Sequence, residues 1–144
     1  MKGYRLIYIA LAALVLVLAG CRPASPAQGV DNAGEPAVTF TLITKVIDGK
    51  MVYIGTGGSI DGVINPDLAV KTGETFEIEV VNGDGMPHDI AVLELGIQTA
   101  LVSKEGQSVS VTATASAAGV YAYYCTVSGH RQAGMEGRLI VSEP

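Results

Sequence analysis

Four residues in the second half of the chain carry side chains that bind metals. Cys125, His130 and Met135 follow one another in the run YYCTVSGHRQAGMEG, and His88 precedes them in GMPHDI. One thiolate, two imidazoles and one thioether form a ligand set for copper in electron transfer, because it suits both oxidation states of the metal. The sequence therefore predicts a copper site built from these four residues.

Each of these residues also has an ordinary structural interpretation. His88 alone would be a hydrogen-bonded histidine at a strand end, His130 a surface residue and Met135 a filler of the core. Met86 is a rival axial thioether two residues before His88, and Glu136 is a second alternative ligand beside Met135. The joint occurrence of Cys, His and Met at short, regular spacing favours the metal site.

The first twenty residues read as a secretion signal. Lys2 and Arg5 precede the apolar run of residues 6–19, which is too short to span a membrane comfortably. The run ends in Leu-Ala-Gly before Cys21, which resembles a bacterial lipoprotein signal. That resemblance implies that Cys21 becomes the lipidated first residue of the mature protein. An uncleaved N-terminal anchor is the alternative, and both interpretations place the domain outside the cytoplasm, on the periplasmic face of a membrane or on the cell surface.

Lipidation of Cys21 would leave Cys125 without a partner, since the chain has two cysteines. An unpaired thiol in an oxidising compartment requires an explanation. Burial as a small apolar residue is one explanation, and a bond to a metal is the other.

The charge of the chain excludes some classes of partner. The chain has 9 Lys and Arg against 14 Asp and Glu, and removal of Lys2 and Arg5 changes the net charge from −5 to −7. Such an acidic domain is not expected to bind nucleic acid or to dock directly on anionic lipid. It suits a basic protein partner, and the lipid would supply the membrane contact.

A tether and one β domain follow the signal. Residues 21–36 contain the lipidated cysteine and a Pro-, Ala- and Ser-rich segment without apolar periodicity, which as a flexible coil would span roughly 20 Å. Residues 37–144 alternate apolar and polar side chains in short runs between Gly-rich turns, typical of an antiparallel β-sandwich or barrel. The expected strands are residues 38–42, 51–54, 75–80, 90–95, 108–113, 120–124 and 138–141.

A Cys-x4-His-x4-Met loop at the end of a Tyr-rich strand, with a distant upstream His, resembles the cupredoxins, the small type 1 blue copper proteins. The resemblance covers residues 37–144 and implies an all-β, Greek-key cupredoxin sandwich or barrel of about 7–8 strands. It also implies one type 1 copper ion, with His88, Cys125 and His130 as equatorial ligands and Met135 as the axial ligand.

The same resemblance assigns roles to neighbouring residues. Tyr121 corresponds to the tyrosine corner of the family, Tyr123 would point into the core, and Tyr124 would point outward beside Cys125. Asp89 departs from the family, which commonly has Asn after the first His ligand to tie the two ligand loops together. A carboxylate there would disfavour the thiolate or would itself be protonated, so Asp89 is expected to affect the redox potential.

The resemblance implies an electron carrier and no enzymatic activity. His130 would reach the surface as the electron exit, among small or apolar groups such as Met86 and Pro87, and a second route would run from Cys125 through Tyr124. Such a patch suits transient docking of redox proteins, for example a c-type cytochrome or a copper enzyme.

Rival functions make different demands on the sequence. Copper nitrite reductases and multicopper oxidases need further His ligands, but the chain has only two His. CuA domains use two Cys in the ligand loop, and here Cys125 stands alone. An extracytoplasmic copper chaperone or storage lipoprotein remains the alternative function, and such a protein should release its copper and usually exposes several Met.

Overall fold

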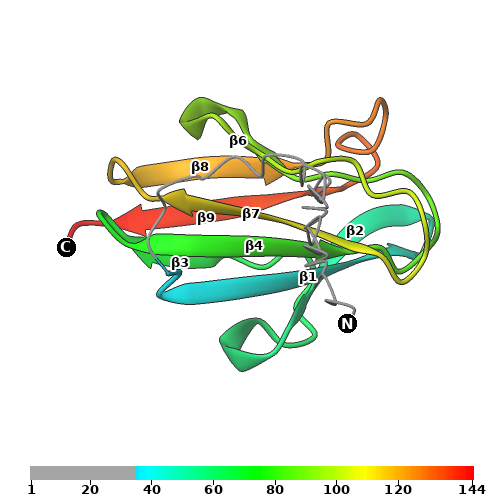
Figure 1. The fold of residues 1–144 in the computed structure, drawn as a ribbon. Helices are drawn as coiled ribbons and strands as arrows, with labels where there is room; N and C mark the ends of the chain where they lie inside the picture. The colour runs from blue at the N-terminus through cyan, green and yellow to red at the C-terminus, as the bar shows by residue number, and fades with distance from the viewer. Residues whose placement is uncertain (1–34) are drawn as a thin grey trace, which may run out of the picture. The chain divides into compact units, whose positions relative to one another are not determined.

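The alternation of apolar and polar residues produces two packed β-sheets in the computed structural model, which describes residues 35–144 (Figure 1). The predicted signal, Cys21 and most of the tether lie outside these residues. Within residues 35–144 no helix has the length and apolar character needed to cross a membrane. The all-β fold class is confirmed.

The described residues form nine strands and two short 3-10 turns. Their bounds are β1 (Val38–Ile47), β2 (Lys50–Thr56), η1 (Gly58–Ile60), β3 (Leu68–Lys71), β4 (Thr75–Val81), β5 (Ala91–Val92), η2 (Leu93–Leu95), β6 (Ile97–Gln98), β7 (Ser108–Thr114), β8 (Gly119–Tyr124) and β9 (Glu136–Ser142).

The prediction that neighbouring strands pair in antiparallel fashion was right for most pairs and wrong for two. One sheet has the order β2-β1-β4-β7 and the other the order β3-β9-β8-β5-β6. Strands β1 and β4 pair in parallel, as do β3 and β9, whereas the other neighbours are antiparallel. The nine strands exceed the seven or eight predicted, and β5 and β6 contain only two residues each.

Strand β4 illustrates how the core forms. Phe76, Ile78 and Val80 are fully buried between the sheets, whereas the side chains of Glu77 and Glu79 alternate with them and are only half-buried. Full burial of an apolar side chain of this size contributes about 1.5–3 kcal/mol. The period-two pattern therefore specifies which face of the sheet is internal.

Three segments differ from their predicted structure. The strand expected at residues 90–95 ends at Val92, because Leu93–Leu95 turns into a 3-10 helix closed by Gly96, whose φ is +68°. Strands β3 (Leu68–Lys71) and β6 (Ile97–Gln98) were not predicted, since runs of four and two residues carry little periodicity.

The loops at one end of the sandwich, on the right in Figure 1, position the candidate site. The loop from β8 to β9 packs on the start of β2, where the N–H of Met51 donates to Ala133 O over 3.2 Å. The loop after β4 is held by paired backbone hydrogen bonds between His88 and Val102. These two loops, far apart in sequence, lie at the same end of the molecule.

Candidate metal centre

Three of the predicted ligands meet between these loops. His88 lies in the loop after β4, Cys125 directly follows β8, and His130 lies in the loop to β9. His88 Nδ1 is 3.2 Å from His130 Nδ1 and 3.9 Å from Cys125 Sγ, and Cys125 Sγ is 3.5 Å from His130 Nδ1. Among residues 35–144, this is the only group of three or more His, Cys, Asp or Glu whose ligand atoms lie within 4.8 Å of one another.

These separations fit a metal ion of the size of copper. Bonds of about 2.0 Å to nitrogen and about 2.3 Å to sulfur, as for zinc, place the atoms of a trigonal set about 3.5–3.8 Å apart. The observed separations of 3.2–3.9 Å bracket that range. One soft sulfur and two imidazole nitrogens are donors that suit copper.

The two histidines differ in their exposure to solvent. His88 has no exposed surface and Cys125 only 1%, whereas His130 is 9% exposed. The cluster is therefore closed to solvent except along the edge of His130.

Backbone hydrogen bonds fold the segment from Cys125 to Met135 into a tight loop. The N–H of Met135 donates to His130 O over 3.1 Å, and the N–H of Cys125 donates to Met135 O over 3.3 Å. Gly129 and Gly134 have φ of +87° and +109°, a region that favours glycine. Met135 is fully buried, and its backbone is fixed against both Cys125 and His130.

Comparison of the sequence with models of known protein families shows to which family the chain belongs. A sequence model described as copper binding proteins of the plastocyanin/azurin family matches residues 63–142, which is more than half of the chain. The chain belongs to the plastocyanin/azurin family. Its donor set is thus consistent with one type 1 copper ion.

Solved structures support the cupredoxin fold. Auracyanin B is 23% identical, with a TM-score of 0.55 over 76% of this chain and 91% of that one. Auracyanin A of Chloroflexus aurantiacus, described as a "blue" copper protein, is 24% identical, with a TM-score of 0.52 over 72% and 98%. The NirK copper nitrite reductase of Thermus scotoductus is 25% identical, with a TM-score of 0.53, but the match covers only 28% of that enzyme and 74% of this chain. No curated protein matches the sequence of this cupredoxin.

Asp89 links the two ligand loops of this cupredoxin, although the family commonly has Asn there. Its Oδ1 accepts from the N–H of Thr126 over 2.7 Å, and its Oδ2 accepts from the hydroxyl of Thr126 and from Gln98 Nε2. Burial opposes ionisation of Asp89, but the hydrogen bonds from Thr126 and Gln98 outweigh it and hold the pKa below its usual value. This direction favours the ionised form of Asp89 in the copper-free protein, the first of the two expected states, in which a carboxylate beside Cys125 disfavours the thiolate.

The pKa shifts of the cluster follow from its burial. Burial raises the pKa of the Cys125 thiol, and the nearby carboxylate of Asp89 adds to this. Burial lowers the pKa of His130, and the proximity of His88 lowers it further. Both shifts favour neutral side chains in the copper-free protein, so binding of a metal to Cys125 must release a proton.

The tyrosines lie as the family resemblance implied. The Tyr121 hydroxyl donates to Ala117 O over 3.0 Å, as expected for a tyrosine corner, and Tyr123 is fully buried. Tyr124 is half-buried, and the Arg131 guanidinium lies 3.9 Å from the centre of its ring.

Three supporting residues were missed by the sequence analysis. Tyr53 is fully buried and donates its hydroxyl to the Asp89 carbonyl. Asn65 bridges β2 to the ligand loop, and Asp84 contacts His88. Of the three, only Asp84 could have been found from the sequence, because it is a carboxylate four residues before the predicted ligand His88.

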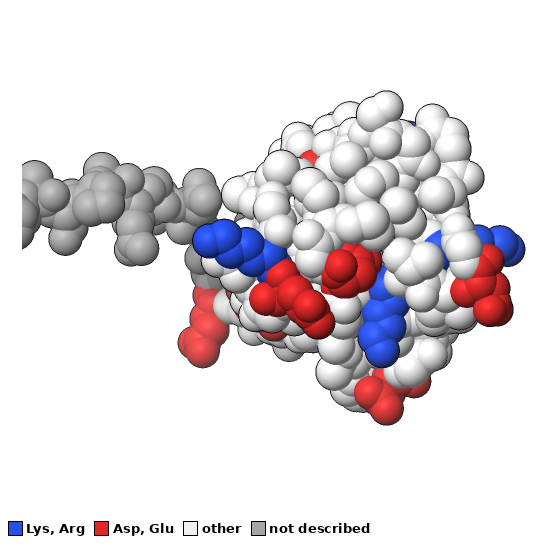
Figure 2. Space-filling model, turned by 90° about the vertical axis from the view of Figure 1, so that its right-hand side faces the viewer, with Lys and Arg blue, Asp and Glu red and all other residues white. Residues whose placement is uncertain are grey.

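Part of the surface at this end of the molecule carries few charges. Figure 2 faces this end, and the upper part of the view, where the loop from β8 to β9 lies, is almost free of Lys, Arg, Asp and Glu. Met86 is half-buried and Pro87 exposed in the neighbouring loop. Arg131 is the charged side chain in the ligand loop, and Glu136 Oε2 pairs with its Nε over 2.7 Å.

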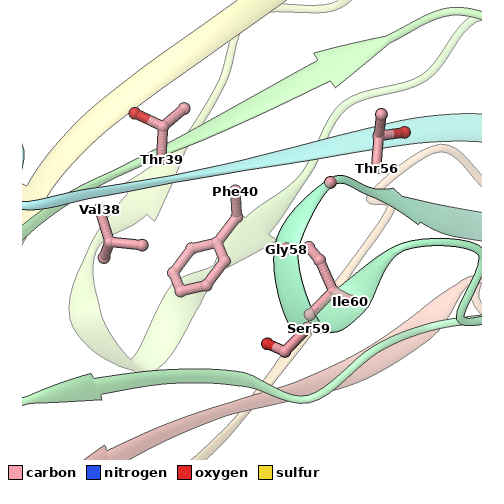
Figure 3. Close-up of a pocket in the computed structure, with 8 residues that line it drawn as sticks. Val38, Thr39, Phe40, Thr56, Gly58, Ser59 and Ile60 are labelled. Atoms are coloured by element: carbon pink, nitrogen blue, oxygen red, sulfur yellow. The ribbon is translucent and has the colours of Figure 1, made fainter.

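A pocket of about 270 Å³ lies elsewhere, between the start of β1 and η1 (Figure 3). Phe40 and Ile60 contribute its apolar wall, and Thr39, Thr56 and Ser59 its hydroxyl groups. No titratable side chain lines it, so this pocket offers no metal ligand and no acid or base.

Proposed function

We propose that this protein is a mononuclear blue copper electron carrier, tethered to a membrane and shuttling single electrons between redox partners outside the cytoplasm. The convergence of His88 Nδ1, His130 Nδ1 and Cys125 Sγ in a buried cluster carries the proposal. The structural likeness to auracyanin A, a "blue" copper protein, supports it.

The ligand assignment is part of this proposal. His88, Cys125 and His130 would hold the ion, and Met135, fully buried at the end of the same loop, would be a fourth and weaker ligand. Copper, when bound, supplies a one-electron couple between its +2 and +1 states. The residues themselves keep water away from that couple and fix the positions of the donors, so that little rearrangement accompanies each electron transfer.

His130 would be the electron exit, because it is the only member of the described cluster with more than a trace of exposed surface. The part of this end that carries few charged side chains, the upper part of the view in Figure 2, favours brief docking of a redox partner such as a c-type cytochrome or a copper enzyme. A second route from Cys125 through Tyr124 would lead to the stacked guanidinium of Arg131.

The membrane tether rests on the sequence alone. A signal over residues 1–20, a lipidated Cys21 and a tether to residue 36 would hold residues 37–144 outside the cytoplasm. Mass spectrometry of the membrane fraction from the native host tests this assignment. A mature chain that begins at Cys21 with attached acyl groups is expected, and Cys21→Ser should leave the protein unlipidated. An unmodified Cys21 on the membrane-bound chain would contradict it.

Copper(II) titration of the purified protein tests the site. One equivalent should produce an intense visible band from the bond between sulfur and copper, and the protein should show reversible one-electron voltammetry. Cys125→Ser should abolish the band. Tight colourless binding, or colour that persists in Cys125→Ser, would refute the ligand set.

Competition for copper with a chelator distinguishes the carrier from a copper chaperone or storage lipoprotein. A carrier should keep its copper against a moderate chelator in both oxidation states, since its ligands are buried. Ready release of Cu(I) to a chelator would favour the chaperone. The proposal includes no enzymatic activity, because both His of the chain belong to the one cluster.

A further inference from the structure

The far side of the His88 ring faces a carboxylate. His88 Nε2 lies 2.9 Å from Asp84 Oδ1, whereas Nδ1 of the same ring faces Cys125 and His130. The His88 side chain has no exposed surface and that of Asp84 is 12% exposed. The contact is therefore shielded from water and is not a chance surface pair.

Asp84 is held in place by its own loop. Asn82 Oδ1 accepts from the N–H groups of Asp84 and Gly85 over 3.2 and 2.7 Å, and Asn82 Nδ2 donates to Met86 O and Val102 O. Asp84 Oδ1 itself accepts from the N–H of Met86 over 3.0 Å. These bonds fix the carboxylate before any metal binds.

The geometry decides which ring nitrogen carries the proton. A neutral imidazole has one N–H donor and one acceptor nitrogen, and a carboxylate only accepts. The proton of His88 therefore belongs on Nε2, where it can be donated to Asp84, and the lone pair belongs on Nδ1. That lone pair points towards Cys125 and His130, so His88 is prepared as a ligand in the copper-free protein.

The carboxylate has little else to bind. Asp84 Oδ2 is buried and, among residues 35–144, it is the only such side-chain oxygen or nitrogen without a hydrogen-bond partner. A carboxylate that accepts from a ligand imidazole makes the other ring nitrogen a stronger donor. A stronger donor stabilises Cu(II) more than Cu(I).

We propose that Asp84 is a positioning residue that fixes the tautomer of His88 and lowers the reduction potential of the copper site. The proposal rests on the proposed copper function. In a purely structural role, Asp84 would only hold the loop by accepting from the N–H of Met86. An Asn side chain at residue 84 can accept that hydrogen bond equally well, so a structural role predicts no change in tautomer or reduction potential.

Asp84→Asn is the decisive variant, and Glu105→Gln is its matched control. Asn keeps the shape of the side chain but loses its charge and can either donate or accept. Glu105 is an exposed carboxylate near Gly85 in the same region, without a side-chain hydrogen bond in the structure, so its removal changes the charge alone. The difference between the two variants isolates the contact with His88.

The first readout uses the copper-free protein. The ¹⁵N chemical shifts of the two imidazoles, assigned with a His130→Gln variant, should place the His88 proton on Nε2 in the natural protein and in Glu105→Gln. Asp84→Asn should shift the population towards the other tautomer. A natural protein with its His88 proton on Nδ1 would overturn the proposal, even if Asp84→Asn failed to fold.

The second readout uses the copper-loaded protein. Loss of such a partner typically costs 10–100-fold in metal affinity, and we expect the loss in Asp84→Asn for Cu(II) to exceed the loss for Cu(I) by about tenfold. That difference raises the reduction potential by about 59 mV for one electron, with no rise in Glu105→Gln. An unchanged potential in a blue Asp84→Asn protein would refute the proposal and leave the carrier function intact. Absence of the blue band from the natural protein would instead refute the carrier function and, with it, the effect on the reduction potential. The tautomer of His88 in the copper-free protein would still decide whether Asp84 positions this side chain.

Discussion

Asn65 connects β2 to the ligand loop, and replacing it with Asp removes one half of that connection. Asn65 Oδ1 accepts from the N–H of Tyr53 over 2.9 Å, and Asn65 Nδ2 donates to Gly134 O over 2.8 Å. The φ of Asn65 is +46°, a left-handed conformation that Asn and Asp tolerate better than most residues. Asn65→Asp therefore keeps the backbone, the shape and the bond from Tyr53, but places an oxygen against the Gly134 carbonyl.

The expected cost follows from these contacts. Loss of one neutral hydrogen bond costs about 1 kcal/mol. Gly134 O keeps a second donor, the N–H of Glu136 at 3.0 Å, so no full penalty for an unpaired carbonyl applies. Repulsion between the new carboxylate and this carbonyl adds to the loss. We expect the free energy of unfolding to fall by about 1–2 kcal/mol, with a fall of about 4 °C in melting temperature per kcal/mol.

Urea denaturation of the copper-free protein measures this cost. Ser59→Asp is the control, because Ser59 is an exposed residue on the same surface pocket as Asn65 and the substitution adds an equal charge without breaking a side-chain hydrogen bond in the structure. Equal stability of the two variants would show that the added charge, and not the bond to Gly134, causes the loss.

Three further predictions concern buried contacts of the scaffold. In Gly137→Ala the new Cβ would lie 2.2 Å from the Tyr123 hydroxyl, so thermal unfolding should show a loss of about 1–3 kcal/mol or more. Tyr123→Phe leaves the Pro66 carbonyl without its buried donor and should cost about 1–3 kcal/mol in urea. The ring atoms Cζ and Cε1 of Tyr123 lie 2.3 and 2.7 Å from the same Cβ position, so the clash should persist in the double variant, and a double variant as stable as Tyr123→Phe alone would argue against it. Asp89→Ala should destabilise the copper-free protein by about 1 kcal/mol more than Asp89→Asn, which can still accept from the Thr126 N–H. Equal denaturation midpoints of the two would contradict that role.

Much of the fold was predictable because strands such as β4 bury one face and leave the other partly exposed. Phe76, Ile78 and Val80 define the inner face of β4 unambiguously. The parallel pairing of β1 with β4 was not predictable, since alternation specifies a face and not a neighbouring strand. The end of β5 was misplaced because Leu93 and Leu95 continue the apolar pattern although their backbone turns.

The meeting of Cys125 and His130 with His88 could be predicted because His and Cys are rare in the chain and the spacing within the loop is short. Two of the residues that support the cluster could not be predicted. Asn65 and Tyr53 act through hydrogen bonds to residues 69 and 36 positions away in sequence, whereas Asp84 lies only four residues before His88. Asn and Tyr are common in turns and cores for other reasons, so only the three-dimensional arrangement distinguishes them.

The cluster takes its donors from two distant segments of the chain. His88 lies 37 residues before Cys125 and 42 residues before His130. The three donor atoms therefore come together only in the folded sandwich, and unfolding disperses them. A metal that binds the folded state and not the unfolded chain stabilises the fold by mass action, so copper would raise the thermal stability of the domain as well as serve its redox function.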